Sequence, residues 1–256
     1  MNKNANDEKI ISFGHKTIND LIDLSKKVNH KKYRIYTKNA NIDKIIDNKC
    51  LRFSNGVDKW NDLVDVKLFN NDNNVCRFGL CFSTFTSESI PMWMLYGGKA
   101  KDGKIIEFSP TVVGKLIDAS KSKECCVMNS KGKCVGKAKI KNMYLCDALY
   151  CSDDYTYILC NNKEIINTNL TITKKQIEKK AIVVKPYTWR YEKETRLIIE
   201  VEKSKIKSRF DKELYVDISI KDIIDNDSYS IIDSPYHKSK KYKQSSLTGK
   251  FRWELD

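Results

Sequence analysis

The chain has 256 residues, of which 47 are lysine or arginine and 33 are aspartate or glutamate, so its formal net charge is +14. This length suffices for one large domain, and the positive charge favours polyanionic partners such as nucleic acid. No apolar run approaches the roughly 20 residues that a membrane helix needs, and the N-terminus lacks a signal-peptide core, so we expect a cytoplasmic protein without a membrane partner.

Cysteine is frequent, with nine residues, an odd number. A reducing compartment predicts free thiols, most of them acting as small core side chains. The cluster from Cys125 to Cys160 has no CxxC pair and lies far from the three histidines in sequence, so a zinc site there is only a minor alternative. The cysteines are Cys50, Cys76, Cys81, Cys125, Cys126, Cys134, Cys146, Cys151 and Cys160.

The first part of the chain predicts alternating helices and strands. An apolar face after Thr17 predicts an N-terminal helical extension over residues 1–30, and residues 31–256 are expected to form one α+β domain. Ser89, Pro91 and the glycines at 97–98 are start and stop signals of a short helix. The predicted elements are a strand over 31–37, a helix and a strand over 41–54, a strand over 76–84, a helix over 89–98, a strand over 101–110 and a helix over 110–120.

The second part is richer in lysine. Residues 121–141 contain Glu124 as their single acid and predict a mobile basic loop or a hairpin. Pro186 marks a bulge or an edge in a later pair of strands. The remaining predicted elements are a strand over 141–153, a polar helix over 161–180, two strands over 181–202 and a strand in the tail from Tyr215, followed by a basic segment over 236–252.

The stretch "WRYEKETR" places two glutamates one residue apart. If this segment is extended, the side chains of Glu192, Glu194 and Arg196 lie on one face. Such a pair is tolerated as a charge ladder on a wet surface, where the arginine compensates it. It is useful in a cleft, where negative charge faces a cationic reaction centre. The local sequence leaves both interpretations open.

The common catalytic signatures are absent. The chain has no P-loop, GxGxxG, HExxH or GxSxG motif. Its histidines, His15, His30 and His237, lie in polar or basic segments and are expected to be solvated.

Several short motifs in a fixed order nevertheless identify a resemblance. From about residue 33 to residue 200, the chain resembles a large prokaryotic family of uncharacterised proteins with the motif order YR, FS, ND, CFS, MWxxY and KxxxWxYExExR. Leu63 departs from the family, which usually has proline after the ND pair. The matching residues are Tyr33-Arg34, Phe53-Ser54, Asn61-Asp62, Cys81-Phe82-Ser83, Met92-Trp93 with Tyr96, Gly103 with Ile105, Ile106 and Phe108, and Lys185 with Trp189, Tyr191, Glu192, Glu194 and Arg196.

The motif order also resembles that of ADP-ribosyltransferases of the arginine-serine-glutamate type. These carry an arginine on the first strand, a serine-led strand, an aromatic residue beside nicotinamide and an ExE motif before a late strand. The resemblance implies an α+β, ADP-ribosyltransferase-like fold of split antiparallel β-sheets with flanking helices and a basic C-terminal tail. It implies NAD as co-substrate, bound between the strands of Arg34 and Glu194, and no metal.

Within this resemblance each residue type has a chemical use. Cleavage of the bond between ribose and nicotinamide develops a cation, which Glu194 would stabilise, while Glu192 would orient or deprotonate the nucleophile. Structural alternatives remain for the other residues, which also suit a strand edge, a turn or the core. The implied cofactor-binding residues are Arg34 for the diphosphate, with Tyr33 beside it, Ser83 for the ribose or Glu194, and Trp93 or Tyr96 for stacking on nicotinamide.

The acceptor is expected to be a macromolecule, with nucleic acid (RNA or DNA) favoured over protein. Such an enzyme would act as a toxin or antiviral defence effector with an antitoxin or chaperone partner. The alternatives are a non-catalytic nucleic-acid-binding protein and a metal-dependent nuclease built on Glu192, Glu194 and Asp62. The residues expected at nucleic acid, unless they are simply solvated, are Lys131, Lys133, Lys137, Lys238, Lys240, Lys241 and Tyr242.

Overall fold

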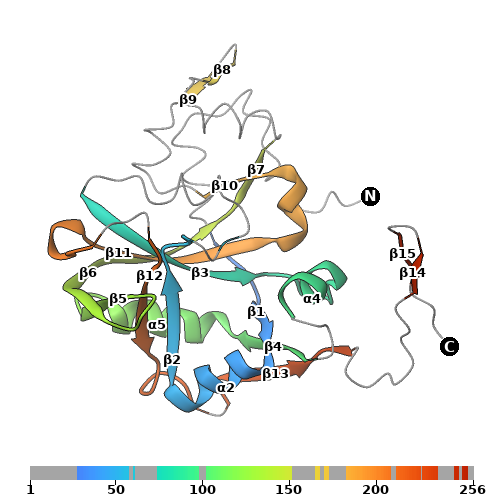
Figure 1. The fold of residues 1–256 in the computed structure, drawn as a ribbon, viewed down its shortest axis with the longest axis horizontal. Coiled ribbons are helices and arrows are strands. Elements are labelled where there is room, and N and C mark those ends of the chain that lie inside the picture. The colour runs from blue at the N-terminus through green and yellow to red at the C-terminus, as the bar shows by residue number, and fades with distance from the viewer. Residues whose placement is uncertain are drawn as a thin grey trace.

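The computed structural model combines helices with sheets that are antiparallel, apart from one two-stranded parallel sheet (Figure 1). None of the helices in the described part of the chain is long and apolar enough to cross a membrane. The residues that the structure describes are 28–57, 60, 74–97, 102–151, 165–167, 170–172, 183–208, 212–225, 227–235, 245–247 and 250–252.

Six strands close into a barrel. Every pairing around it is antiparallel. In order, the strands are β11 (Glu194–Glu202), β6 (Cys134–Asp147), β5 (Glu124–Asn129), β12 (Leu214–Ser219), β2 (Cys50–Ser54) and β3 (Val75–Ser83), which pairs again with β11.

A second set of strands branches from the barrel at β3. β1 (Tyr33–Lys38), β4 (Gly103–Phe108) and β13 (Tyr229–Asp233) follow β3 in the sheet order. On this side β3 pairs with β2 at Gly79 and with β1 at Ser83. The neighbour of β3 therefore changes within four residues, and the sheet forks there.

Three described helices and two short 3-10 turns connect the strands. They are α2 (Asn39–Asn48), α4 (Ile90–Tyr96), α5 (Pro110–Ser120), η3 (Tyr187–Glu192) and η4 (Lys203–Lys205). Ser109 caps α5, since its hydroxyl accepts a hydrogen bond from the Val112 N–H at 3.3 Å. Three two-stranded sheets complete the description: β7 (Leu149–Cys151) with β10 (Val184–Pro186), β8 (Ile165–Asn167) with β9 (Leu170–Ile172), and β14 (Ser245–Leu247) with β15 (Lys250–Arg252).

The core fills the inside of the barrel. Alternate residues of its strands point inward, as their period of two requires, and are fully buried. Phe53, Phe78, Val127, Leu197 and Val216 are each 0% exposed. The opposite faces of β3 and β11 are consequently turned outward, and there they carry polar residues.

Most of the predicted elements are confirmed. β1, α2, β2, β3, α4, β4 and α5 lie where the patterns predict them, and the basic stretch 121–141 is largely the β5–β6 hairpin. The predicted helix over 161–180 is wrong where the structure describes it, because β8 and β9 form a hairpin. Their residues include Ile165, Ile166, Thr171 and Ile172, whose branched side chains favour strands over helices. The N-terminal extension up to residue 27 lies outside the described residues.

The expectation of free cysteines also needs a correction. Cys126 on β5 and Cys134 on β6 are joined in a disulfide across the hairpin, with Cα atoms 5.9 Å apart. Neighbouring antiparallel strands bring such positions within the span of a disulfide. Cys50, Cys76, Cys81, Cys125 and Cys146 are free thiols.

Candidate functional site

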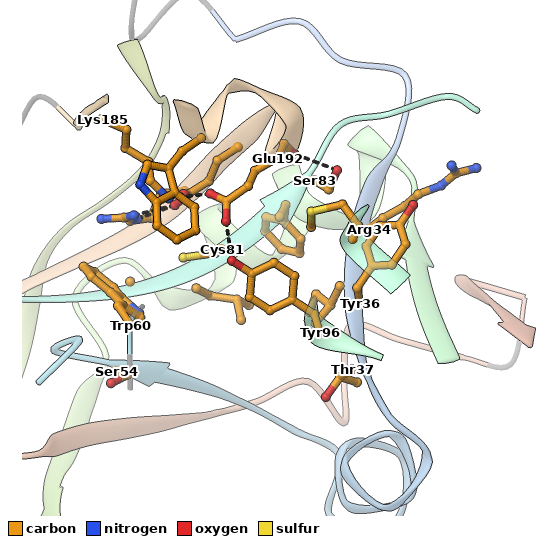
Figure 2. A pocket seen from close by; sticks show the side chains of 18 of the residues that line it. Arg34, Tyr36, Thr37, Ser54, Trp60, Cys81, Ser83, Tyr96, Lys185 and Glu192 are labelled. Carbon is orange, nitrogen blue, oxygen red and sulfur yellow. Dashed lines mark hydrogen bonds and ion pairs between the residues drawn. The ribbon is translucent and has the colours of Figure 1, made fainter. Parts of the chain in front are cut away.

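A cavity of about 400 Å³ lies at the fork between β1, β2 and β3 (Figure 2). The residues Leu80, Cys81 and Phe82 of β3 line it between the two pairings that define the fork. Residues from most of the motifs in the family resemblance also line this cavity. These are Arg34, Ser54, Cys81, Ser83, Tyr96, Lys185, Trp189, Glu192, Glu194 and Arg196.

The two glutamates belong to different elements. Glu192 ends η3, Lys193 adopts a left-handed conformation with φ 41°, and Glu194 begins β11. The expectation of one extended segment is therefore wrong for Glu192. Lys193 is held in place because its carbonyl accepts a hydrogen bond from the N–H of Thr84 at 3.0 Å. This turn brings both carboxylates into the same cavity.

One ammonium group joins the two carboxylates. The Nζ of Lys185 donates to Oε2 of Glu192 and, at 2.7 Å, to Oε2 of Glu194. The Nε of Arg196 donates to Oε1 of Glu194 at 2.8 Å. All four residues are buried, with Glu192 4% and Glu194 5% exposed, so the surface charge ladder is excluded.

The backbone around the carboxylates is also fixed by side chains. The Ser83 hydroxyl donates to the Glu192 carbonyl at 2.8 Å. The Glu194 N–H donates to the Tyr150 hydroxyl at 2.8 Å. Buried polar groups satisfied in this way hold a unique geometry, so the carboxylates are pre-organised rather than free to move.

The environments of the two carboxylates shift their pKa values in opposite directions. Burial raises the pKa of Glu192 above its usual value, and the charge of Glu194 raises it further, against the opposing charge of Lys185. Burial alone would also raise the pKa of Glu194, but the charges of Arg196 and Lys185 hold it well below its usual range. Carboxylates with separated pKa values are suited to different roles, one to proton transfer and the other to a permanent negative charge.

Aromatic side chains form the walls. The Tyr96 hydroxyl hydrogen-bonds Oε1 of Glu192, and Figure 2 shows this contact at the centre of the cavity. Trp60 lies against Arg196, whose guanidinium carbon is 3.9 Å from the ring centroid. Both side chains pass over Gly79, where an added Cβ would come within 2.8 Å of Arg196 Cδ. Gly79 therefore provides the room for the arginine.

Arg34 lines the cavity, but its guanidinium points away from Glu192 (Figure 2). Its Nε donates to Oε2 of Glu107 at 2.7 Å, and its NH1 group donates to the Ser87 carbonyl at 2.8 Å. Burial would raise the pKa of Glu107, but hydrogen bonds from Lys32 and Arg34 lower it overall. Arg34 thus clamps the loop before α4 onto β4.

Two of the expected cofactor-binding residues do not line the cavity. Tyr33 is 3% exposed and packs on Phe82 in the barrel core, with ring centroids 5.5 Å apart. Trp93 is 1% exposed and its Nε1 donates to Glu88 at 3.0 Å. Tyr33 alternates with Arg34 along β1, so it points to the opposite face. Trp93 lies on the same side of α4 as Tyr96, but deeper, in a buried cluster with Tyr36 and Met92 against which Tyr96 packs.

Sequence reasoning gave no role in the site to Lys185, Cys81 or Trp60, and it gave Arg196 only that of compensating the glutamates on a surface. Lys185 and Arg196 both belong to the "KxxxWxYExExR" motif, and in the structure they form ion pairs with its two glutamates. Their presence in the motif was therefore the signal that could have identified them. Cys81 likewise stands in the CFS motif, and burial raises its thiol pKa well above the usual value. Trp60 lies outside the motifs, and only its contact with Arg196 identifies it.

The expected contacts with nucleic acid lie elsewhere. Lys131, Lys133 and Lys137 are exposed on the β5–β6 hairpin and do not line the cavity. Lys238, Lys240, Lys241 and Tyr242 of the basic tail lie outside the described residues, as does Asp62 of the nuclease alternative. Within the described ranges, no three His, Cys, Asp or Glu side chains form a group that could hold a metal ion.

No protein-family model matches the chain, and comparisons with curated proteins and with solved structures found no match either.

Proposed function

We propose that the protein is an NAD-dependent ADP-ribosyltransferase that transfers ADP-ribose to a macromolecular acceptor, with nucleic acid favoured. One relation carries the proposal: Ser83 on β3 is directly opposite Arg34 on β1 and Glu194 on β11. The arginine, serine and glutamate of the resemblance thus form one row across three neighbouring strands. Paired residues of antiparallel strands share a face, so the three side chains start from one face of the sheet, and all three residues line the cavity.

The fork in the sheet supports the same proposal. The resemblance implies two antiparallel sheets that part to hold NAD, and here β1 and β2 part beside β3. The closed six-stranded barrel, to which β2 and β3 belong, is not a feature that the resemblance implies. The proposed fold is therefore an ADP-ribosyltransferase-like core in which the cavity at the fork holds the nicotinamide ribose.

The proposed chemistry separates the two carboxylates. The bond between C1′ of the ribose and nicotinamide breaks, and its electron pair leaves with nicotinamide. Glu194 is ionised at neutral pH and faces the cation that develops, which stabilises the transition state more than the ground state. A nucleophile of the acceptor then bonds to C1′ and gives its proton to Glu192, whose raised pKa suits a general base.

Lys185 and Arg196 have supporting roles in this proposal. Two buried carboxylates this close together would repel each other, and one would take up a proton. Lys185 contacts both and Arg196 contacts Glu194, so the cations keep Glu194 charged before substrate binds. Tyr96 and Trp189, which also line the cavity, offer aromatic faces for nicotinamide.

The proposal extends to the biological setting. NAD as co-substrate and a macromolecular acceptor fit a cytoplasmic enzyme. Uncontrolled modification of nucleic acid would harm the cell that makes the enzyme, so we include a role as toxin or antiviral defence effector, restrained by an antitoxin or chaperone partner.

The test is to incubate the protein with NAD and with RNA, DNA and protein acceptors, following nicotinamide release and acceptor mass. Wild type should release nicotinamide and add one ADP-ribose mass to an acceptor. Glu194→Gln should reduce the rate at least a hundredfold, because the charge facing the cation is removed. Glu124→Gln, at an exposed glutamate of β5, is the matched control and should retain full activity. A wild type that neither binds nor consumes NAD would refute the proposal.

A further inference from the structure

A second cavity of about 640 Å³ adjoins the first on the side of α2. Thr37, Arg52 and Ser54 line both cavities, so the two share a wall. Thr37 and Ser54 lie on the side of the first cavity away from Glu192 in Figure 2. A molecule in the second cavity therefore borders the space in front of the carboxylates, and the proposed transferase needs an acceptor at that position.

Arg52 forms a planar platform in the shared wall. Its guanidinium carbon lies 3.8 Å from the centroid of the Tyr215 ring. Its Nε and NH2 groups donate to the two carboxylate oxygens of Asp217 at 2.8 and 2.9 Å. The ring and the carboxylate fix the plane, while the side chain remains 60% exposed. A guanidinium held in this way offers its second face for stacking on a flat ring.

One face of α2 supplies hydrogen-bonding groups beside this platform. Asn41, Lys44, Ile45 and Asn48 line the second cavity and are spaced three, one and three residues apart, which places them on one side of the helix. The amides of Asn41 and Asn48 carry both donors and acceptors, as the edge of a nucleobase does. Lys44 adds a positive charge suited to phosphate.

The tip of the β5–β6 hairpin brings two lysines to the edge of the same region. Asn129 Oδ1 accepts hydrogen bonds from the N–H groups of Lys131 and Lys133, each at 3.0 Å. Between them, an added Cβ at Gly132 would lie 3.9 Å from the Tyr215 hydroxyl. The turn is thus fixed next to Tyr215 and presents exposed lysines, which suits a phosphate backbone more than a protein acceptor.

We propose that the second cavity is the acceptor subsite, which binds an unpaired base of single-stranded nucleic acid; this inference rests on the proposed transferase function. The base stacks on Arg52, and Lys131 and Lys133 contact neighbouring phosphates. A nitrogen of the base bonds to C1′ of the ribose as nicotinamide departs with the electron pair of the broken bond, and the proton of that nitrogen passes to Glu192. Duplexes are excluded because their bases are stacked and paired.

The test measures binding of a fluorescein-labelled single strand by fluorescence anisotropy without NAD, using RNA, DNA and duplex forms of one mixed sequence. Arg52→Lys keeps the charge beside Asp217 but removes the plane, and it should raise the Kd of single strands roughly tenfold. Asn48→Ala, on the exposed helix face, should also weaken binding. Arg190→Lys is the matched control, because Arg190 also stacks on a tyrosine, Tyr187, at 3.9 Å but lines neither cavity. Its Kd should equal that of wild type.

The lysines give an independent readout. The double change Lys131→Ala with Lys133→Ala should make the slope of log K against log salt shallower by roughly 1.4, because each single-strand phosphate that a lysine neutralises contributes about 0.7. Tighter binding of RNA than of DNA would assign recognition to the 2′-hydroxyl, and equal binding would assign it to the base and phosphate.

Two outcomes would overturn the inference: equal affinity for duplexes and single strands, or unchanged strand binding in Arg52→Lys, whether or not that variant also loses NAD affinity. A mass gain on protein alone would replace nucleic acid with a protein acceptor. Nicotinamide release by wild type is measured in parallel. Release without strand binding refutes only this inference, whereas strand binding without any release refutes the transferase function.

Discussion

Glu192 and Glu194 contact the same ammonium group, although one ends a 3-10 turn and the other begins a strand. Lys185 comes from a third element, β10, which pairs with β7 outside the barrel. The site therefore depends on the docking of β10 and η3 against the start of β11.

The opposite pKa shifts of the two carboxylates predict a pH dependence of activity. Nicotinamide release by wild type should rise with pH as Glu192 loses its proton, with a midpoint above the usual 4.5 of a glutamate, because burial raises its pKa. Glu192→Gln should lose this limb and react slowly at every pH. Rates measured across the pH range test this, with Glu124→Gln as the control that keeps the limb. If the rise of the rate with pH persists in Glu192→Gln, a group other than Glu192 is responsible for it.

The same group predicts the sign of a stability change. The folded chain binds the Glu192 proton more tightly than the unfolded chain, because its pKa is raised on folding, so this contribution to stability is fully present below the usual pKa. It disappears as the pH rises through the folded value. The free energy of unfolding of wild type, relative to Glu192→Gln, should therefore fall between acidic and neutral pH. Urea denaturation at matched pH values measures the difference, and a rise would contradict the assignment.

Removal of the shared cation should destabilise the fold. Lys185→Met leaves two buried carboxylates near each other, and breaking a buried ion pair costs about 3–5 kcal/mol. Lys104→Met is the matched control, since Lys104 lies 3.6 Å from a largely exposed Asp233 carboxylate. That change should cost less than ~1 kcal/mol. Equal losses in the two variants, measured by urea denaturation, would mean that the buried network contributes little.

Gly79→Ala tests the space reserved for Arg196. Its Cβ would lie 2.8 Å from Arg196 Cδ and 3.2 Å from the Trp60 ring, so the arginine side chain must shift from the position in which it contacts Glu194. We expect a loss of about 1–3 kcal/mol in stability together with reduced activity. Gly114→Ala in α5 is the control, because its added Cβ meets nothing within 4 Å and should stabilise the helix by about 0.5–1 kcal/mol. Full activity in Gly79→Ala would show that Arg196 need not stay in place.

Arg34 and Glu107 should act as a coupled pair. Arg34→Gln leaves a buried carboxylate with fewer partners, and Glu107→Gln leaves a buried guanidinium. The double variant removes both charges, so its loss should be smaller than the sum of the two single losses, with a coupling of about 1–3 kcal/mol. Urea denaturation of the four proteins measures this coupling. Additive losses together with a large rise in KM for NAD would instead favour contact with the NAD diphosphate.

Local sequence patterns were enough to predict most of the secondary structure. Alternating apolar residues predict β1, β3 and β11 because strands have a period of two, and Ser109 with Pro110 predicts the start of α5. The motif order selected Arg34, Ser83, Tyr96, Glu192 and Glu194, which line one cavity, but also Tyr33 and Trp93, which do not. The local pattern was wrong at β8 and β9, where branched residues in a polar segment favour paired strands over the predicted helix.

How these residues meet depends on the tertiary structure. Whether the two carboxylates lie on a surface or in a buried network depends on Lys185 and Trp60, which reach the site from separate segments. The left-handed Lys193 breaks the simple alternation that would have placed Glu192 on the strand. The fork of β3 depends on pairings between residues that are distant in sequence, such as Ser54 with Gly79 and Arg34 with Ser83. No local pattern encodes such pairings, because each forms only when strands from distant parts of the chain fold together.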